Sequence, residues 1–512
     1  MSITYNSASY FTLPLVEESG FREYDARWII EPIAGQSSEV QINYRGLVQL
    51  GNWIGRFLQL PENGQHSSII VGHDFRRYAE NAKNALVLGL LASGIDVTDI
   101  GLSVTPMVYF AQYDFSVPAC AIVTASHNPN GWTGVKMGHT YSETFGPDRM
   151  KALQEFAKQS PAIVSNLPSH LSGRYSQRGD VLERYTAHLK NQWQERLSGL
   201  PRLRIAVETG NGTAGIVFPS LLTDLGFDVV AGHVELDWDF PHFNPNPESI
   251  PFLRSIQSLV TQSGAEIGIC IDGDGDRIGV IDDQGKIVFS DRVGLIIAKK
   301  LEEVMGPSKF VVDVKSTSLF TSQLRSETIW EKTGHSYIKS RVKSEGALAG
   351  FERSGHFFFN PPFGLGYDDA FAAGLMLLWI VCSEKSRQRH LSDLLAELPA
   401  SHQSPNRQPR VPDDKKYKVV DEISREIQAR LAPDGKFAGK KVKDVILING
   451  IRLEFEDGSW FLIRASSNTP NLVIVAETFD QDGSDLKNLD SALREILAQF
   501  PEVTAFDPLY EP

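Results

Sequence analysis

The chain has 512 residues, which is too many for one hydrophobic core, so we expect three or four domains. Apolar residues make up 42% of the chain and charged residues 22%, as in an ordinary globular protein. The net charge of −13 argues against nucleic acid or an anionic membrane as a partner for the surface as a whole.

The cysteines, the N-terminal segment and the short apolar runs favour a cytoplasmic protein. Cys120, Cys270 and Cys382 are widely spaced and lie in apolar surroundings, so we interpret them as buried thiols in a reducing compartment rather than as disulfides or a zinc site. The N-terminus lacks the basic and apolar segments of a signal peptide. The longest apolar run, residues 370–382, is too short to span a bilayer.

The first sixty residues combine an arm, a charged segment and a helix. Residues 1–20 are typical of an irregular arm, and residues 21–28 are dense in charged and aromatic side chains. For that segment, the simplest interpretation is an edge strand with a solvated charged face. Apolar residues recur at helical spacing over residues 40–60, so we predict a helix there.

A strand followed by a polar loop and a helix then recurs three times along the chain. Such units are the building blocks of α/β domains, and their irregular spacing argues for three related domains rather than a solenoid. The strands are predicted at 68–72, 203–207 and 309–314, with loops at 73–77, 208–212 and 315–318, helices at 79–93 and 214–224 and after 318, and further strands at 94–97 and 225–230.

The domain boundaries follow polar, proline-bearing segments. Residues 160–172 separate the first two domains, and residues 401–409 are the clearest linker. The region after that linker has a mixed pattern, which predicts a smaller α+β domain. Its predicted elements are a helix at 417–431, strands at 445–455, 459–464 and 472–477, and a helix at 484–498.

Residues 272–277, Asp-Gly-Asp-Gly-Asp-Arg, lie between two apolar runs and indicate a metal site. The runs at 267–271 and 278–281 predict two buried strands joined by a tight loop. Three carboxylates held so close together repel one another unless a cation lies among them, and carboxylate ligands without Cys or His favour Mg²⁺. The alternative is a solvated acidic turn. A calcium EF-hand is a poor match, because Arg277 occupies the position that requires Gly.

A second polar segment follows the apolar strand at 119–123. It contains Ser126, His127 and Asn128, and Lys136 comes ten residues after the serine. Backbone N–H groups around the serine and a nearby lysine suit phosphoryl chemistry on that hydroxyl. An ordinary Ser/Asn/Pro turn is an equally good interpretation when this segment is considered alone.

Two later segments offer ligands for a phosphate and a sugar. Residues 464–470 follow a strand and combine one guanidinium group with hydroxyls and an amide, which favours oxyanion binding over a plain hairpin loop. In residues 352–356, Glu352 and Ser354 alternate, so both would point to one side of an extended loop, where sugar hydroxyls could bind them. His356 alone would be a structural histidine, but in this context we favour a role in the site.

In five segments the chain resembles the α-D-phosphohexomutase family, and within it the phosphomannomutase/phosphoglucomutase group. The matching segments span nearly the whole chain in the order of the family. They are 21–27 (F-R-x-Y-D-x-R), 124–129 (T-x-S-H-N-P), 272–277 (D-G-D-x-D-R), 352–356 (E-x-S-G-H) and 464–469, the phosphate loop.

The resemblance implies an α/β enzyme of four domains around a central cleft, three related mixed α/β domains and a smaller C-terminal α+β domain. We expect the phosphoserine loop in residues 1–165, the metal loop in 166–295, the sugar loop in 296–404 and the phosphate loop in 405–512. The implied reaction interconverts hexose 1-phosphate and hexose 6-phosphate through a phosphoserine enzyme and a hexose 1,6-bisphosphate. The expected partners are small sugar phosphates.

The resemblance also assigns roles residue by residue. Ser126 looks like the phosphoryl carrier, and Arg27, Lys136 and Arg277 would stabilise the moving phosphoryl group and assist proton transfer. His356 matches the histidine of the sugar loop. The implied Mg²⁺ ligands are Asp272, Asp274 and Asp276 with an oxygen of phosphorylated Ser126, and the implied substrate ligands are Lys315, His335, Glu352, Ser354, Arg464, Ser466, Ser467, Asn468 and Thr469.

Three residues depart from the family pattern: Trp28 and Phe351, where Gly is common, and Arg353, at a position that varies with substrate class. They leave the sugar open between mannose or glucose phosphate and, as the alternative, glucosamine phosphate. A non-catalytic sugar-phosphate sensor and a metal-dependent phosphatase are two further hypotheses. The sensor would require a broken metal loop or a missing serine, and a phosphatase would have no use for a second phosphate clamp.

Overall fold

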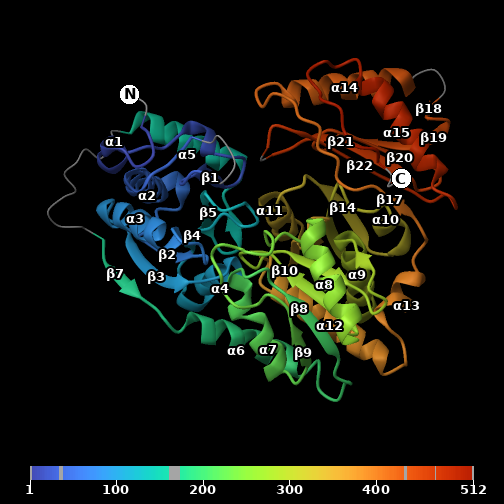
Figure 1. Cartoon of the computed structure of the whole chain (residues 1–512), viewed down its shortest axis with the longest axis horizontal. Coiled ribbons are helices and arrows are strands. Elements are labelled where there is room, and N and C mark those ends of the chain that lie inside the picture. The colour runs from blue at the N-terminus through green and yellow to red at the C-terminus, as the bar shows by residue number, and fades with distance from the viewer. Residues whose placement is uncertain (1–2, 34–38, 161–172, 432–434, 468, 510–512) are drawn as a thin grey trace. The chain divides into compact units, whose positions relative to one another are not determined.

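The computed structural model describes residues 3–33, 39–160, 173–431, 435–467 and 469–509 (Figure 1). The chain divides into two compact units, Met1–Val293 with Ser354–Leu391 and Gly294–Arg353 with Ser392–Pro512. Among the described residues, no helix has the length and the apolar character needed to cross a bilayer.

The first sheet of the first unit has the strand order β1-β5-β4-β2-β3-β7, and β6 pairs with β5. Strands β2, β3 and β4 are parallel, so their carboxyl ends share one edge, whereas β1 and β5 run antiparallel to their neighbours. The strands are β1 (Ala26–Ile29), β2 (Ser68–His73), β3 (Asp96–Leu102), β4 (Ala119–Val123), β5 (Trp132–Thr140), β6 (Glu143–Thr144) and β7 (Tyr175–Gln177).

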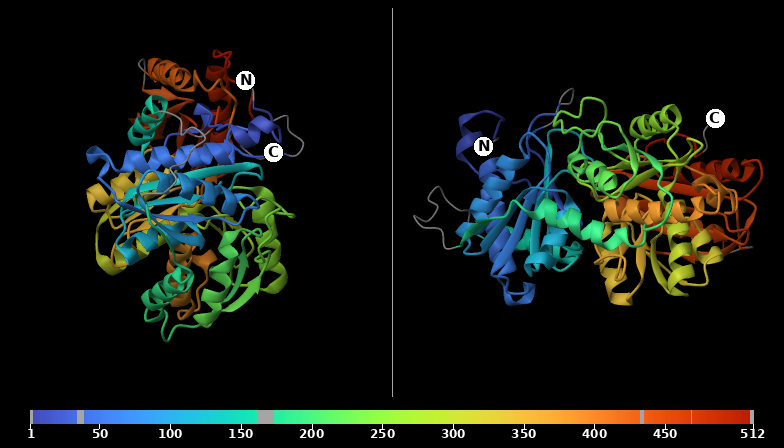
Figure 2. Two further views of the ribbon diagram at one scale, coloured as in Figure 1. Left: turned by 90° about the vertical axis from the view of Figure 1, so that its left-hand side faces the viewer. Right: turned by 90° about the horizontal axis from the view of Figure 1, so that it is seen from below.

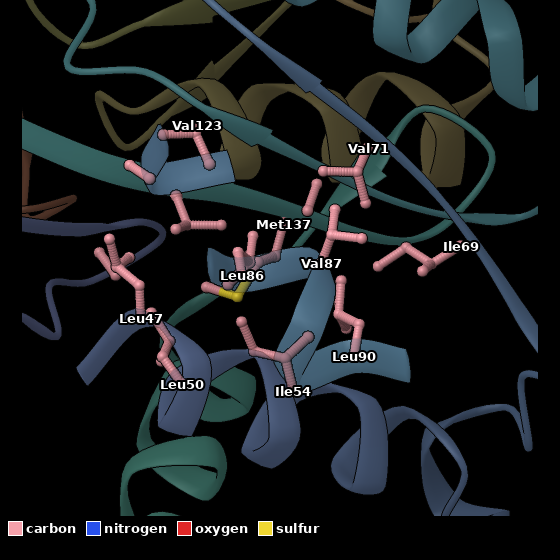
Figure 3. Packing of buried hydrophobic residues seen from close by; sticks show 14 of the residues in the cluster. Leu47, Leu50, Ile54, Ile69, Val71, Leu86, Val87, Leu90, Val123 and Met137 are labelled. Carbon is pink, nitrogen blue, oxygen red and sulfur yellow. The ribbon is translucent and has the colours of Figure 1, made fainter. Parts of the chain in front are cut away.

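Two neighbouring helices, α2 (Tyr44–Leu58) and α3 (Ala79–Ala92), cover one face of this sheet (Figure 2). The side chain of Asn43 caps α2 by accepting a hydrogen bond from the Gly46 N–H group at 2.7 Å. Figure 3 shows the resulting core, in which Leu47, Leu50 and Ile54 of α2 and Leu86, Val87 and Leu90 of α3 meet Ile69, Val71, Val123 and Met137 of the sheet.

The second sheet has the order β12-β11-β10-β8-β9, with β8, β9 and β10 parallel and the β10–β11 pair antiparallel. Both strands of that pair are fully buried apolar runs, which explains why the polar residues between them form a tight loop. The strands are β8 (Arg204–Glu208), β9 (Asp228–Ala231), β10 (Ile267–Ile271), β11 (Ile278–Ile281) and β12 (Ile287–Val288).

The first unit also contains several helices and one short strand outside these two sheets, and one helix crosses its boundary. These elements are α1 (Ala8–Thr12), η1 (Glu18–Gly20), η2 (Pro61–Asn63), α4 (Thr105–Phe115), α5 (Pro147–Gln159), α6 (Val181–Gln194), η3 (Thr213–Ile216), α7 (Phe218–Asp224), α8 (Ile250–Ser263), β16 (Phe357–Phe359) and α12 (Ala370–Lys385); α9 (Ser290–Met305) spans the boundary between the units.

The second unit contains a parallel set of strands and a larger antiparallel sheet. Strand β13 (Lys309–Asp313) pairs in parallel with β14 (Glu327–Glu331) and β15 (Ala349–Phe351). The antiparallel sheet has the order β17-β22-β21-β20-β19-β18. Its strands are β17 (His402–Gln403), β18 (Lys436–Phe437), β19 (Lys440–Ile446), β20 (Ile451–Phe455), β21 (Trp460–Ala465) and β22 (Leu472–Thr478), and the helices of the unit are α10 (Leu319–Gln323), α11 (His335–Glu345), α13 (Leu391–Ala396), α14 (Lys416–Leu431) and α15 (Ser484–Leu497).

The fold class predicted from the sequence is confirmed: three α/β domains precede a smaller, sheet-rich C-terminal domain. Helices were predicted correctly at α2, α3, α14 and α15, and the three thiols are free and buried. The predicted domain boundaries and the central cleft stay predictions, and most of the separating segment at 160–172 lies outside the described residues.

Four local predictions were wrong. The expected irregular arm at 1–20 contains the helix α1. The charged face of the edge strand β1 is buried, because the Arg27 Nε donates to Asp25 inside the domain. Residues 445–455 form parts of two strands, β19 and β20, because Asn449 and Gly450 adopt positive φ angles of 59° and 121° and turn the chain. The expected linker at 401–409 includes β17, which pairs with β22.

Candidate active site

The loop between β10 and β11 brings together the three aspartates predicted from the sequence. Asp272, Asp274 and Asp276 are fully buried, and one oxygen from each lies within 4.8 Å of the others. Asp272 Oδ1 accepts three backbone N–H groups of its own loop, those of Gly275, Asp276 and Arg277, each at 3.1 Å. These hydrogen bonds fix the loop, so the carboxylates are held close together before any ligand arrives.

Lys136 of β5 supplies a positive charge to this loop. Its Nζ donates to Asp274 Oδ2 at 2.7 Å and also pairs with Asp276. Burial alone would lower the pKa of Lys136, but the charges of Asp274 and Asp276 outweigh burial and raise it. The ammonium group therefore stays charged and offsets part of the repulsion among the carboxylates.

The pKa values of Asp272 and Asp276 nevertheless shift in opposite directions. Burial raises the pKa of Asp272 well above its usual value, and the charges of Asp276 and Asp274 raise it further. Burial also acts against ionisation of Asp276, but Lys136 and His356 hold the pKa of that carboxyl well below its usual range. The Nε of Arg277 also donates to Asp272 Oδ2 at 3.2 Å, so Lys136 and Arg277 set two positive charges against three buried carboxylates. A divalent cation would relieve the remaining repulsion.

The donor set fits a hard cation. The Oδ1 atom of Asp274 is buried and has no hydrogen-bond partner among the described residues, which is costly unless a ligand occupies it. The three carboxylates, with Ser126 nearby, offer the oxygen ligands that Mg²⁺ prefers.

Ser126 lies in the same unit and faces the metal loop. Its Oγ donates to Asp272 Oδ2 at 3.2 Å, and the Nη2 of Arg277 donates to Ser126 Oγ at 3.3 Å. The serine is buried and adopts a left-handed conformation with φ of 49°, which a residue with a Cβ rarely occupies. Such strain at a reactive residue indicates a functional turn rather than an ordinary one.

Two other predicted residues, Arg27 and His356, contact the groups around Ser126 rather than its Oγ. Arg27 does not contact Ser126 Oγ; its Nη1 donates to Asn128 Oδ1 at 2.8 Å and to the Ala125 carbonyl at 3.4 Å, on either side of the serine. The Nε2 of His356 lies 3.4 Å from Asp276 Oδ1. His356 therefore belongs with the metal loop, whereas Arg27 supports the serine loop.

Sequence reasoning missed four residues around this centre. Thr105, at the start of α4, donates to Asp274 Oδ2 at 2.7 Å, and Asp368 lies 3.9 Å from His356 Nε2. Asp74 and Arg76 follow β2 and contact the serine loop that follows β4. A usable signal existed for this last pair, because β2 and β4 are parallel neighbours whose carboxyl ends meet at one edge of the sheet.

In the second unit, the predicted residues Lys315, His335 and Glu352 are buried at the ends of neighbouring elements. Glu352 Oε1 accepts the Gly334 N–H group at 2.6 Å, immediately before His335 begins α11. Burial raises the pKa of Asp313, which the charge of Lys315 lowers and that of Glu352 raises. Lys315 and Glu352 thus lie in one electrostatic cluster. Ser354 belongs to the first unit, where its Oγ lies 3.2 Å from His356 Nδ1.

Two arginines hold the backbone around Lys315. Arg452 of β20 donates through Nη1 to the carbonyls of Val314 and Ser316, at 2.8 and 2.7 Å. Arg353 donates to the Lys315 carbonyl at 3.4 Å. Three consecutive carbonyls are therefore bound by guanidinium groups, which fixes the segment that presents Lys315.

The three departures from the family pattern have structural explanations. Arg353 also donates to the Ser404 carbonyl at 2.9 Å, so it links two backbone segments. Phe351 is buried against Phe310 and Phe320. Trp28 is buried, and its indole N–H group donates to the Glu17 carbonyl at 2.7 Å. Each serves packing or backbone hydrogen bonding.

The predicted phosphate loop begins at the end of β21. Arg464 is buried, and its Nε has no hydrogen-bond partner among the described residues, so it is available to an anion. Thr469 Oγ1 donates to Ser466 Oγ at 2.8 Å, which closes the turn. Ser467 is also buried, and Asn468 lies outside the described residues.

A buried serine beside a carboxylate cluster and cationic side chains, on three α/β domains followed by a sheet domain, fits an enzyme that transfers a phosphoryl group at that serine. Comparison with known families agrees. Residues 19–162, 183–285 and 289–402 match α/β/α domains I, II and III of phosphoglucomutase/phosphomannomutase, respectively. The chain therefore belongs to the phosphoglucomutase/phosphomannomutase family of α-D-phosphohexomutases.

Individual relatives cover almost the whole chain. A phosphomannomutase/phosphoglucomutase of Pseudomonas syringae pv. tomato is 30% identical over 91% of this chain and 93% of its own length. A phosphoglucomutase of Neisseria meningitidis serogroup A is 31% identical over 89% of this chain and 92% of its own. The crystal structure of a phosphoglucomutase/phosphomannomutase family protein from Burkholderia thailandensis has a TM-score of 0.78 and 28% identity, covering 96% of this chain and 99% of that one.

Proposed function

We propose that this chain interconverts hexose 1-phosphates and hexose 6-phosphates, with mannose or glucose as the sugar and Ser126 as the phosphoryl carrier. The observation that carries the proposal is the position of Ser126 Oγ, 3.2 Å from Asp272 Oδ2 and 3.3 Å from Arg277 Nη2. The relatives named phosphomannomutase/phosphoglucomutase and phosphoglucomutase support the choice of sugars.

The reaction has two symmetrical halves. In the first, the bond between Ser126 Oγ and phosphorus breaks, and a new bond joins phosphorus to the free hydroxyl oxygen of the hexose phosphate. The hydroxyl proton passes to a side chain of the site, in a transfer that Arg27, Lys136 and Arg277 would assist. In the second half, the other phosphoryl group of the bisphosphate returns to Ser126 Oγ, and the proton returns to the sugar oxygen. No phosphate is consumed or released.

The side chains of the first unit serve this transfer by alignment and by charge. Phosphoryl transfer needs the reacting oxygens in line and the charge on the equatorial oxygens neutralised. Arg277 and Lys136 would meet the charge of the moving phosphoryl group, and Arg27 would hold the loop that presents it. Mg²⁺, bound by Asp272, Asp274 and Asp276 with a phosphoserine oxygen, would withdraw further negative charge.

The second unit would hold the rest of the substrate. The buried Arg464, with its unpartnered Nε, supports a clamp for the phosphate that is not reacting, completed by Ser466, Ser467, Asn468 and Thr469. Lys315, His335, Glu352 and Ser354 would bind the sugar. In this proposal a hexose 1,6-bisphosphate is both the intermediate and the activator of the enzyme.

The proposal also covers the limits of the four domains and the cellular compartment. The domains would comprise residues 1–165, 166–295, 296–404 and 405–512. The three free, buried thiols support a reducing compartment such as the cytoplasm.

Replacing the serine tests the proposal. Ser126→Ala should abolish interconversion of mannose and glucose 1- and 6-phosphates, whereas Ser176→Ala, on the exposed edge strand β7 of the same sheet, should leave it unchanged. Full activity of Ser126→Ala would refute the assignment. Comparing turnover of mannose, glucose and glucosamine 1-phosphates identifies the sugar, and fastest turnover of glucosamine 1-phosphate would make the chain a phosphoglucosamine mutase.

The same assay separates the non-mutase alternatives. Tight binding of hexose phosphate without turnover, even with Mg²⁺ and a bisphosphate primer, would indicate a sensor. Release of free phosphate faster than formation of isomerised sugar phosphate would indicate a phosphatase. Either result from the unmodified chain contradicts the mutase.

A further inference from the structure

Arg76 lies under the serine loop and binds its backbone rather than its hydroxyl. Its guanidinium Nη2 donates to the carbonyls of Ser126 and Asn128, both at 2.7 Å, and its Nη1 donates to the Pro129 carbonyl at 3.2 Å. Arg76 itself is only 4% exposed. One buried side chain thus binds three carbonyls of the loop that carries the reacting serine.

The loop needs such support because its conformation is unfavourable. Ser126 has a φ of 49°, in the left-handed region that residues with a Cβ avoid, and such a residue persists only where its surroundings hold it. Asp74, two residues before Arg76, holds the preceding part of the loop: its Oδ2 accepts Thr124 Oγ1 at 2.7 Å and the Ala125 N–H group at 3.3 Å.

Arg76 is itself held rigidly. Its Nε donates to Asp74 Oδ2 at 3.3 Å, and its guanidinium carbon lies 5.1 Å from the centre of the Phe240 ring. The planar guanidinium group can serve several acceptors in fixed directions, which a lysine cannot do. Its hydrogen bonds go to the three loop carbonyls, to Asp74 and, at 3.5 Å, to Asn130 Oδ1, so its effect on Ser126 Oγ is exerted through the peptide chain.

We propose that Arg76 is a positioning residue for phosphoryl transfer: by binding the carbonyls of Ser126, Asn128 and Pro129 it keeps Ser126 Oγ in register with Asp272 and Arg277. This inference rests on the proposed function, in which Ser126 carries the phosphoryl group. A positioning residue of this kind affects the rate of transfer at Ser126 and leaves substrate binding elsewhere intact, since small misplacements of a reacting atom are costly.

The test compares Arg76→Ala with its neighbour Arg77→Ala in the full-length enzyme. The Arg77 side chain is 62% exposed and pairs with Glu31, so it is a matched control on the same loop. For Arg76→Ala we expect kcat to fall about a hundredfold, with KM for hexose phosphate within twofold of the unmodified enzyme. Free guanidinium ion should restore part of the lost kcat in Arg76→Ala and none in Arg77→Ala. A loss confined to KM, or a kcat within twofold of the unmodified enzyme, would overturn the proposal.

A second measurement covers the case in which Arg76→Ala does not fold. Arg76→Lys keeps the charge and most of the volume but cannot span three carbonyls, so Ser126 should gain phosphate from glucose 1,6-bisphosphate at least tenfold more slowly, as followed by intact mass. Phosphorylation of Arg76→Lys at the normal rate would overturn the positioning role alone. Failure of the unmodified enzyme to be phosphorylated at Ser126 would instead overturn the proposed function.

Discussion

Lys136→Met should couple the stability of the first unit to Mg²⁺ more tightly than in the unmodified protein. Lys136 is buried, donates to Asp274 Oδ2 at 2.7 Å and pairs with Asp276. Removing one partner of a buried ion pair costs about 3–5 kcal/mol, because the other charges remain buried. For a domain of about 150–250 residues this corresponds to a fall in Tm of roughly 6–20 °C in the presence of EDTA.

Mg²⁺ should restore much of this loss. In Lys136→Met no ammonium group competes with a divalent cation for the carboxylates of Asp274 and Asp276. The affinity of the protein for Mg²⁺ should therefore rise, and Mg²⁺ binding should stabilise the folded state more strongly. The Mg²⁺-induced rise in Tm should therefore be larger for Lys136→Met than for the unmodified protein. Differential scanning calorimetry with EDTA and with Mg²⁺ measures both values.

Lys83→Met is the matched control. Lys83 is also buried in the first domain, and it pairs with the buried Asp99 rather than with an aspartate of the metal loop. Its loss should lower Tm in EDTA by a comparable amount, but Mg²⁺ should give no greater rise than in the unmodified protein. An equal Mg²⁺ effect in all three proteins would refute the electrostatic reasoning.

Three further substitutions test other parts of the structure. Asp274→Asn should lower turnover at limiting Mg²⁺ at least tenfold, by our estimate of about 1.4 kcal/mol or more, and an unchanged Mg²⁺ titration would exclude Asp274 as a ligand. Burial raises the pKa of Asp369 to about 6, so between about pH 4 and 6 the folded protein retains a proton that the unfolded chain has lost. The free energy of unfolding should therefore fall by up to about 3 kcal/mol as the pH rises from about 4 to 6. In urea unfolding, Asp369→Asn should show a shallower dependence of this free energy on pH, and an identical dependence would contradict the shift. Arg452 is fully buried and pairs with Glu454. Arg452→Met should destabilise the second unit by about 3–5 kcal/mol, because the Glu454 carboxylate loses its partner. Adding Glu454→Met should recover part of this loss in thermal unfolding, and no recovery would exclude an unpaired charge as the cause.

The parts of the site that could be predicted are those encoded by neighbouring residues. Asp272, Asp274 and Asp276 are close in the chain, and the apolar runs around them predict two buried strands, so their proximity follows from local sequence. Ser126 was predictable for the same reason, since it follows a strand and adjoins other polar residues. The left-handed φ of Ser126 was not, because it depends on tertiary contacts.

The parts that were missed depend on residues far apart in the chain. Arg76 binds carbonyls some fifty residues away, and Thr105 donates to Asp274 from another domain. Their residue types alone do not distinguish such side chains from solvated loop residues, and the one signal for Arg76 was its place directly after a parallel strand. The fold errors have a similar cause at 401–409, where polar composition predicts a linker but pairing with β22 prevails. At 445–455 the Asn449-Gly450 turn signal was present in the sequence and was overlooked.

The central claim is that Ser126 exchanges its phosphoryl group with hexose phosphate. The most direct test is a single-turnover experiment with enzyme carrying ³²P on Ser126, mixed with unlabelled glucose 1-phosphate or mannose 1-phosphate and Mg²⁺. The label should leave the serine and appear in hexose bisphosphate and hexose 6-phosphate. Label that stays on the protein, or that appears as inorganic phosphate before any sugar phosphate, would contradict the account.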